Sequence, residues 1–360
     1  MRGYRYRIFP TEEQSQLIDL TISHCRYVWN GFLALKEFRY NEFGEKLNYA
    51  DMSKLLTEIK KTDDFLCDVD AIALQQTLRQ LDDTYKRFFK GLCKYPKFKS
   101  KKNPKNSYKT MNVKMEYNMI KIPKVGWLQF TNSRDISGRV VSATISKTPT
   151  NKYYISLTVD ETVEKLKPVG KEVGIDLGLK TFAVCSDGFE IKAPKPLWKY
   201  STRLKKLQRK LSKKPKRYTK NYEKLRLKIA LLHEKIANIR KDFHHKLSTK
   251  LIRENQLICL ETLNIKGMTK NHKLARAILD CGFYSFVEML KYKASMYGRQ
   301  IQFIDMFYPS SKTCSCCGSV KDKLLLSERT YICEKCGTII DRDYNASINI
   351  LVEGKRLIRG

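Results

Sequence analysis

The sequence is poor in acidic residues and has no long uncharged apolar run. Asp and Glu number 37 against 70 Lys and Arg, which gives a formal net charge of +33. A membrane-spanning helix needs about 20 consecutive apolar residues, so the composition argues against a membrane protein. Such a large positive excess makes a soluble chain repel itself. We therefore expect a polyanionic partner, and nucleic acid is favoured over an anionic membrane surface.

Features of an export signal are also missing. The first residues, MRGYRYRIFPTEEQ, carry charges but no apolar centre, unlike a secretory signal. We therefore expect a reducing, cytoplasmic location, where the eleven cysteines serve as thiols or metal ligands. A disordered chain is excluded, because 20 Tyr, 16 Phe and 3 Trp provide ample material for a packed core.

The first 170 residues predict one strand, a small group of helices and a set of further strands. Residues 1–9 alternate apolar and basic side chains, as a strand does. Thr11 and Gln14 have the spacing of a capping box that begins a helix. A second helix is expected over 49–59, and apolar side chains every three or four residues over 74–92 predict a third. Strands are predicted over 119–123, 127–130, 139–147 and 153–159, and the N-terminal strand could join them.

Residues 94–109 differ in composition from both neighbouring segments. They hold seven lysines, three aromatic residues, two prolines and no acids, which favours neither a helix nor a core strand. Lysines among aromatic rings suit neutralisation of phosphates and stacking of bases, although a solvated face is an equal alternative for any single basic run. The expected nucleic-acid contacts are Lys97, Lys99, Lys101 and Lys102.

Amide side chains are suited to reading adenine edges. We therefore also consider Gln76 and the segment 107–112, with Thr110 and Asn112, as contacts to a short DNA motif. An ordinary position on an exposed helix face is an equally good interpretation of Gln76.

From residue 171 onward the pattern is mixed α/β. Residues 171–193 predict three consecutive antiparallel strands separated by glycine-rich turns. Residues 199–250 predict a long helical hairpin with 19 Lys and Arg against three acids, a surface suited to a nucleic-acid duplex. Strands are then expected over 256–261 and 300–304, and helices over 273–297 and 341–352.

The strongest chemical signal is a group of four cysteines near the C-terminus. Two C-x2-C pairs are separated by fifteen residues, and each pair is followed by glycine. This spacing is typical of a zinc site, and four thiolates close the coordination shell, so the site would be structural. Buried free cysteines, or a shifted ligand set that includes Cys316, are the alternatives. The expected zinc ligands are Cys314, Cys317, Cys333 and Cys336.

Three carboxylates far apart in the sequence form a second candidate site. Asp176 lies on a buried-looking strand between glycines, Glu261 ends an apolar strand, and Asp343 begins a helix. Singly, each has an ordinary explanation as a turn residue, a solvated strand end or a helix cap, and Asp341 competes for the capping position. Together they predict a Mg²⁺ site, because Mg²⁺ prefers hard oxygen ligands and two such ions can clamp a phosphodiester.

Several motifs occur in a characteristic order. They are GIDLGLKTFA, the strand ending in Glu261 with LNIKGM two residues later, SSKTCSCCG, YICEKCG and DRDYNASINI. With RYRIFPTEEQ and YPKFKSKK nearer the N-terminus, they cover almost the whole chain. The sequence resembles the TnpB (OrfB) family of bacterial insertion sequences, which is related to the type V CRISPR effectors.

The resemblance implies a multidomain α/β protein with a RuvC nuclease domain of RNase H-like fold. A wedge-like β-barrel would comprise residues 1–10 and 107–170, and a helical recognition bundle residues 11–106. The nuclease domain would comprise 171–310 and 337–360. A zinc ribbon that binds the target nucleic acid would be inserted at 311–336.

The resemblance also implies an RNA-guided DNA endonuclease of a bacterial transposon. A transposon-derived guide RNA would pair with double-stranded target DNA beside a short motif read by the protein. Asp176, Glu261 and Asp343 would be the catalytic Mg²⁺ ligands for two-metal-ion hydrolysis. Asp343 is preferred to Asp341 because the family ligand precedes Asn345 by two residues. The protein would act in the bacterial cytoplasm, at the nucleoid when bound to DNA, and one copy per RNA is plausible.

Three other functions stay open. The first is a nuclease-inactive RNA-guided repressor, although all three carboxylates are present here. The second is a transposase that acts without RNA, since RNase H-like sites can also join DNA strands. The third, on fold analogy alone, is a Holliday-junction resolvase or an RNA-processing nuclease.

Overall fold

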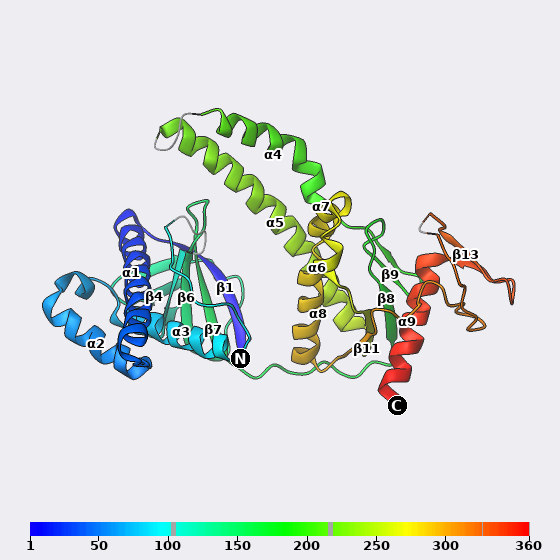
Figure 1. Cartoon of the computed structure of the whole chain (residues 1–360), viewed down its shortest axis with the longest axis horizontal. Coiled ribbons are helices and arrows are strands. Elements are labelled where there is room, and N and C mark those ends of the chain that lie inside the picture. The colour runs from blue at the N-terminus through cyan, green and yellow to red at the C-terminus, as the bar shows by residue number, and fades with distance from the viewer. Residues whose placement is uncertain (102–105, 215–218, 326, 360) are drawn as a thin grey trace. The chain divides into compact units, whose positions relative to one another are not determined.

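The computed structural model describes residues 1–101, 106–214, 219–325 and 327–359. Two compact units make up the chain, Met1–Thr162 and Val163–Gly360 (Figure 1). Among the helices of the described residues, none is both long and apolar enough to cross a membrane.

The first unit contains a seven-stranded antiparallel sheet in the order β2-β6-β7-β1-β5-β4-β3. The N-terminal strand is central and pairs with β7 on one side and β5 on the other, which confirms that it joins the later strands. Its alternation is also confirmed, because Tyr4, Tyr6 and Ile8 are buried. The closure of this sheet into a barrel stays a prediction. The strands are β1 (Arg2–Phe9), β2 (Asn106–Thr110), β3 (Lys114–Glu116), β4 (Met119–Ile122), β5 (Gly126–Phe130), β6 (Arg139–Lys147) and β7 (Tyr153–Asp160).

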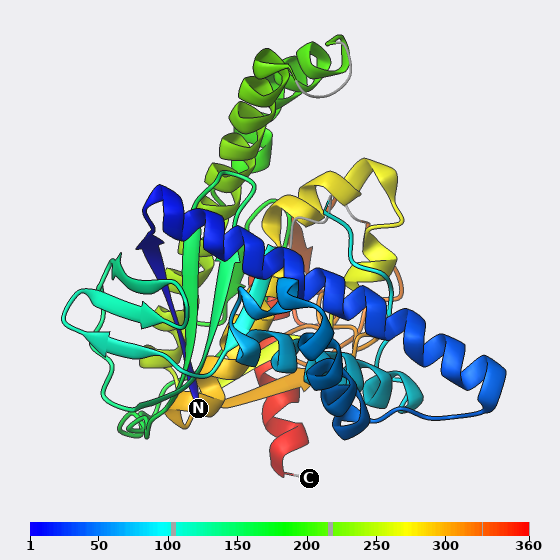
Figure 2. The same cartoon turned by 90° about the vertical axis from the view of Figure 1, so that its left-hand side faces the viewer.

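Three α-helices and a short 3-10 helix pack with this sheet around one continuous hydrophobic core. The predicted capping box is present: the Gln14 backbone N–H donates to Thr11 Oγ1 at 3.3 Å, and the Thr11 N–H donates to Gln14 Oε1 at 3.0 Å. Figure 2 shows α1 crossing one face of the sheet. The helices are α1 (Glu12–Phe43), α2 (Tyr49–Thr62), η1 (Asp64–Cys67) and α3 (Ala71–Phe89).

The expectation that residues 94–109 contain no strand is wrong at the C-terminal end of the segment. Residues from Asn106 onward form β2, which pairs with β6. Tyr108 and Thr110 point inward and are buried. The many lysines of the segment hid this alternation in the sequence, because one of them, Lys109, lies between the two inward positions.

The second unit is built on a five-stranded mixed sheet in the order β10-β9-β8-β11-β12. The first three strands in sequence are antiparallel to one another, as predicted, whereas β8, β11 and β12 are parallel. The α/β class is therefore confirmed. The strands are β8 (Glu172–Asp176), β9 (Ala183–Cys185), β10 (Glu190–Ile191), β11 (Leu257–Glu261) and β12 (Gln300–Ile304), and a separate hairpin comprises β13 (Thr330–Ile332) and β14 (Ile339–Asp341).

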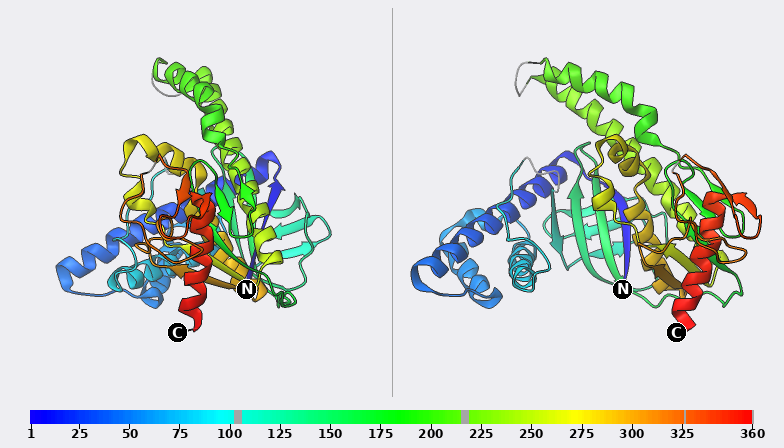
Figure 3. Two further views of the ribbon diagram at one scale, coloured as in Figure 1. Left: turned by 90° about the vertical axis from the view of Figure 1, so that its right-hand side faces the viewer. Right: turned by 45° about the vertical axis from the view of Figure 1, so that its right-hand side comes forward.

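Helices of the second unit cover the sheet and form a projecting hairpin (Figure 3). The predicted hairpin is present as α4 (Pro196–Ser212) and α5 (Lys220–Glu254). The single helix expected over 273–297 is instead two helices, because Gly282 takes a left-handed conformation with φ +66°. The other helices are α6 (Ile265–Met268), α7 (His272–Cys281), α8 (Phe283–Tyr297) and α9 (Arg342–Arg359).

The C-terminal helix α9 approaches the sheet unusually closely, at two glycines. A Cβ added at Gly174 on β8 would collide with the Ser347 carbonyl oxygen and lie 2.6 Å from the Leu351 nitrogen. A Cβ added at Gly354 on α9 would lie 2.8 Å from Cys259 Cβ on β11. The absence of side chains at these glycines lets backbone pack directly against its neighbours.

We expect Gly174→Ala to destabilise the second unit by about 1–3 kcal/mol, because the added methyl meets backbone that cannot rotate away. Gly170→Ala is the matched control, since a Cβ there meets nothing within 4 Å. Urea denaturation of the two variants measures the difference in the free energy of unfolding. Equal stability of the two variants would contradict the close packing of α9.

Candidate active site and cysteine cluster

Two of the three candidate carboxylates lie at the same edge of the second sheet. β8 and β11 are parallel neighbours in which Leu260 stands opposite Ile175. The next residue of each strand is a carboxylate, Asp176 on β8 and Glu261 on β11. The carboxyl ends of parallel strands meet at one edge, so the fold brings these two residues side by side from positions 85 apart in the sequence.

The third carboxylate comes from the first turn of α9. Asp341 precedes the helix, and its Oδ1 accepts the backbone N–H groups of Asp343 and Tyr344 at 2.9 and 3.0 Å. Asp341 therefore caps the helix, as its position allowed. The Asp343 carboxylate has no capping role and lies 3.7 Å from the Arg329 guanidinium. This division of roles supports the choice of Asp343 over Asp341.

Asp176 lies close enough to Asp343 and Glu261 for their charges to affect its pKa. Burial raises the pKa of Asp176 to about 7, and the negative charges of Asp343 and Glu261 contribute to that rise. Burial also raises the pKa of Glu261. Arg342 offsets part of this negative charge at Asp176. A partly buried group of hard oxygen donors with excess negative charge is chemically suited to divalent cations.

Among the described residues, the four cysteines are the only metal-ligand group whose ligand atoms all lie within 4.8 Å of one another. The oxygens of the three carboxylates are therefore further apart than this. Ligation by all three carboxylates therefore requires side-chain rotation or more than one ion. The oxygen donors and the negative charge of these residues fit a divalent metal, once their side chains rotate toward it or more than one ion binds.

The four predicted cysteines form one compact cluster, with all sulfur atoms within 4.8 Å of one another. The sulfur atoms lie 3.7 Å apart in one pair and 3.6 Å apart in another. Tetrahedral zinc with Zn–S bonds of about 2.3 Å places its sulfurs about 3.8 Å apart, so the set fits Zn²⁺. The cluster comprises Cys314, Cys317, Cys333 and Cys336.

Two glycines shape the loops that carry these thiols. Gly318 and Gly337 have φ of +74° and +71°. Their N–H groups each donate to the first cysteine carbonyl of their pair, Cys314 or Cys333, at 2.9 Å. The tight turns aim both sulfurs of a pair at one point. Cys316 is exposed and lies outside the cluster, so the shifted ligand set is not the one that the fold assembles.

Amide side chains on α9 anchor the segment that enters the cysteine cluster. Asn345 accepts the Ser315 N–H at 2.9 Å and donates to the Thr313 carbonyl at 2.7 Å. Asn349 donates to the carbonyls of Ser310 and Thr313 at 2.8 and 2.6 Å. The sequence motifs alone give this amide pair no role. Their spacing of four residues, which places two amides on one helix face, is the signal that could have indicated it.

The residues considered for motif recognition are mostly committed to internal contacts. Gln76 is only 7% exposed, and its Nε2 lies 3.3 Å from Met111 Sδ, so the alternative of an exposed helix face is wrong. The Thr110 hydroxyl donates to Asp70 Oδ2 at 2.5 Å and is buried. Asn112 is exposed. Contact of these residues with nucleic acid stays a prediction.

The lysines of the basic segment also differ from one another. Lys97 and Lys101 are exposed, whereas Lys99 turns inward, with its Nζ 3.6 Å from the centre of the Trp29 ring. Asn30 fixes the backbone of Lys99 through bonds of 2.7 and 2.9 Å. Burial lowers the pKa of Lys99 to about 8. Lys102 lies outside the described residues.

Comparison with known families gives matches along most of the chain. Residues 154–272 match the OrfB_IS605 family, described as "Probable transposase". Residues 283–350 match a "Cas12f1-like, TNB domain". Residues 1–46 match a "Helix-turn-helix domain", in a segment that forms β1 and α1 here.

Two curated relatives align with nearly the full chain. A Streptomyces pristinaespiralis protein named "Putative RNA-guided DNA endonuclease" is 36% identical, over 98% of this chain and 89% of the relative. An Escherichia coli K12 protein named "Putative RNA-guided DNA endonuclease InsQ" is 30% identical, over 99% of this chain and 93% of the relative. Alignments of this extent span both compact units.

A solved structure shares the fold. The cryo-EM structure of a Cas12f1–sgRNA–target DNA complex matches with a TM-score of 0.59 and 16% identity, over 94% of this chain and 83% of that chain. The similarity extends over both compact units of the chain.

We expect the protein to bind one zinc ion and to lose it when a ligand is removed. Cys333→Ser should abolish stoichiometric zinc and lower the thermal stability, because the three remaining thiolates no longer close the shell. Cys316→Ser is the matched control and should keep both properties. Elemental analysis together with thermal denaturation makes the measurement. Retention of full zinc in Cys333→Ser would contradict the ligand set.

We expect Lys99 to make stability rise with pH between about 8 and 10.5. Its pKa is about 8 in the folded protein and 10.5 for an ordinary lysine, so the unfolded chain binds more protons in this window. Lys99→Met should remove that contribution, and Lys97→Met, at an exposed neighbouring position, should keep it. Urea denaturation at several pH values tests the difference. An unchanged pH dependence in Lys99→Met would show that Lys99 stays charged above Trp29.

Proposed function

This chain belongs to the TnpB (OrfB) family, and from that membership we propose that it is an RNA-guided DNA endonuclease. The observation that carries the proposal is the pair Asp176 and Glu261 at one sheet edge, with Asp343 of α9 close enough for its charge to act on Asp176. The chain that holds them aligns almost completely with relatives of that name. Neighbouring carboxylates at a partly buried position support Mg²⁺-dependent phosphodiester hydrolysis rather than binding alone.

The proposed domain roles follow the family. Residues 1–10 and 107–170 form the wedge, and 11–106 the recognition bundle that holds guide RNA. Residues 171–310 and 337–360 form the RuvC-like nuclease, with 311–336 as its zinc ribbon. The proposed wedge and bundle share one hydrophobic core, although their proposed contacts with RNA differ.

The chain's own residues prepare the site. The negative charges of Asp343 and Glu261 both act on Asp176, and the positive charge of Arg342 offsets part of their effect. Asp341 fixes the first turn of α9 and so keeps the Asp343 carboxylate available. Bound Mg²⁺ would supply an activated water and neutralise charge at the scissile phosphate. Glu261 pairs with Ile304 on the parallel strand β12, and Asp176 pairs with Val184 on the antiparallel strand β9, so both carboxylates belong to strands rather than to loops.

The α4–α5 hairpin supplies a surface for phosphates. One face of α4 forms an open hollow of about 600 Å³ lined by basic side chains. Contacts of this kind are independent of sequence and sensitive to salt, which agrees with a protein that leaves sequence recognition to a paired RNA. The lining comprises Thr202, Lys205, Lys206, Arg209, Lys210 and Lys213.

We expect Asp176→Asn to reduce Mg²⁺-dependent cutting of guide-matched DNA by at least about 10³-fold while RNA still co-purifies, because the change removes a ligand charge and leaves the fold intact. Glu190→Gln, an exposed carboxylate on β10, should cut normally. The assay uses the protein expressed with its native flanking RNA and a plasmid library of targets beside randomised bases.

The same assay separates the alternatives. Cutting that persists in Asp176→Asn would refute the catalytic assignment. Wild-type protein that retains RNA and target without cutting would be a guided repressor. Strand joining without RNA would instead identify a transposase.

A further inference from the structure

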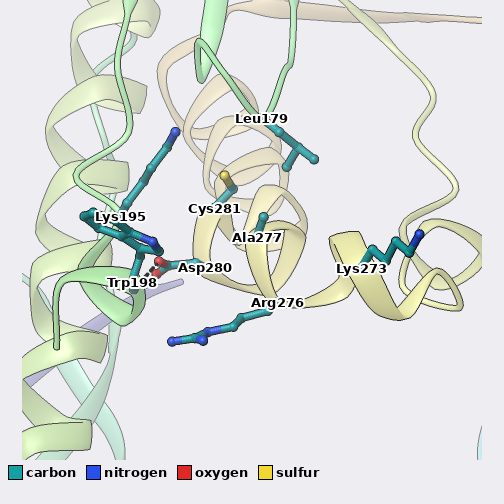
Figure 4. Close-up of a pocket in the computed structure, with 8 residues that line it drawn as sticks. All are labelled: Leu179, Lys195, Trp198, Lys273, Arg276, Ala277, Asp280 and Cys281. Carbon is teal, nitrogen blue, oxygen red and sulfur yellow. Dashed lines mark hydrogen bonds between the residues drawn. The ribbon is translucent and has the colours of Figure 1, made fainter. Parts of the chain in front are cut away.

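A cleft lies where the hairpin helix α4 begins beside the end of α7 (Figure 4). Its volume is about 530 Å³, within the range of about 300–1,000 Å³ typical of ligand sites. Three segments distant in sequence meet there: the β8–β9 loop, the start of α4, and α7. Its polar and aromatic walls are formed by Lys195, Trp198, Lys273, Arg276 and Asp280.

A buried carboxylate holds the walls of the cleft together. Asp280 is 5% exposed, and its two oxygens accept the backbone N–H groups of Leu197 and Trp198, each at 2.9 Å. Two charge-assisted bonds of this kind commit the carboxylate to the start of α4. Asp280 therefore fixes the backbone of Leu197 and Trp198 at the start of α4.

The open face of the cleft combines one aromatic ring with positive charge. The Trp198 side chain is 75% exposed, an unusual position for so large an apolar group. Lys195, Lys273 and Arg276 line the same space, and none of them forms an ion pair with a carboxylate among the described residues. Apolar side chains supply the floor, namely Leu179, Ala277 and Cys281.

The cleft lies close along the chain to the candidate active site. Leu179 follows Asp176 by three residues on the β8–β9 loop. Three residues of extended chain span at most about 11 Å. A ligand seated against Leu179 is therefore near the backbone that carries the proposed catalytic carboxylate.

We propose that this cleft seats one nucleotide of a single DNA strand on its way to the carboxylates. The base stacks on Trp198, and Lys195 and Arg276 neutralise its phosphates. Exposed aromatic rings beside cations favour unpaired bases, whereas the bases of a duplex are already stacked on one another and are not free to stack on Trp198. This assignment rests on the proposed endonuclease function and adds a position at which that enzyme holds its substrate.

The test measures binding of a fluorescein-labelled oligo(dT) to the RNA-containing complex in an Asp176→Asn background, which prevents cutting. The measurement is made at elevated salt, where phosphate contacts weaken. Trp198→Ala should then bind the oligonucleotide about tenfold more weakly than the parent. Trp198→Phe should bind within about threefold of the parent, because a ring still stacks on the base. Trp198 is exposed, so neither change disturbs the core. Tyr117→Ala, at a 96% exposed tyrosine in the other unit, is the matched control and should bind normally.

Two further measurements locate the contact. Oligo(dT) carrying 5-iodouracil should crosslink to the peptide containing Trp198 in the parent but not in Trp198→Ala. Arg276→Gln should reduce the slope of log K against log salt by about 0.7, the value for one phosphate on a single strand. A normal slope in Arg276→Gln together with normal affinity in Trp198→Ala would overturn the proposal.

The outcomes also separate this proposal from the function on which it rests. Guided cutting by a protein whose affinity for oligo(dT) does not depend on Trp198 would overturn the cleft and leave the endonuclease. Trp198-dependent binding in a protein that never cuts would leave the cleft and overturn the endonuclease. Crosslinking of Trp198 to the co-purified RNA instead of oligo(dT) would overturn the assignment to DNA.

Discussion

The close approach of α9 to the sheet is the constraint on which the rest of the second unit depends. Gly174 and Gly354 remove the two side chains that would separate helix from strands. Because α9 lies this close to the sheet, the charge of Asp343 raises the pKa of Asp176. The candidate active site thus depends on two positions that carry no functional group, because a methyl at either would displace the helix and its carboxylate.

The cysteine cluster could be predicted from the sequence because each C-x2-C pair is a local signal, whereas the metal chemistry of the carboxylates stays a prediction. The spacing of the cysteines indicates which four of them would bind a metal. The two strand-end carboxylates each follow an apolar run, and parallel pairing of these runs fits an α/β pattern. Thr11 and Gln14 likewise specify a helix start within four residues. In each case a short stretch of sequence specifies one element or one pair of ligands, although the stretches themselves lie far apart in the chain.

Features that depend on tertiary packing could not be predicted in this way. Gln76 and Thr110 are polar residues in amphipathic or basic surroundings, and only the meeting of α3 with β2 buries them. The break at Gly282 lies within an otherwise continuous helical pattern. Lys99 has the same sequence context as the exposed lysines, and its contact with Trp29 on α1 turns its side chain inward.

The amide pair on α9 has a consequence for how this part of the protein can vary. Asn345 and Asn349 bind the chain entering the cysteine cluster, and the same helix carries Asp343. Hydrogen bonds therefore cross the boundary between the cysteine cluster and the rest of the second unit. If recombination exchanged residues 311–336 alone, the new loop would face Asn345 and Asn349, which evolved with the original loop. We therefore expect the cysteine cluster and α9 to be inherited together.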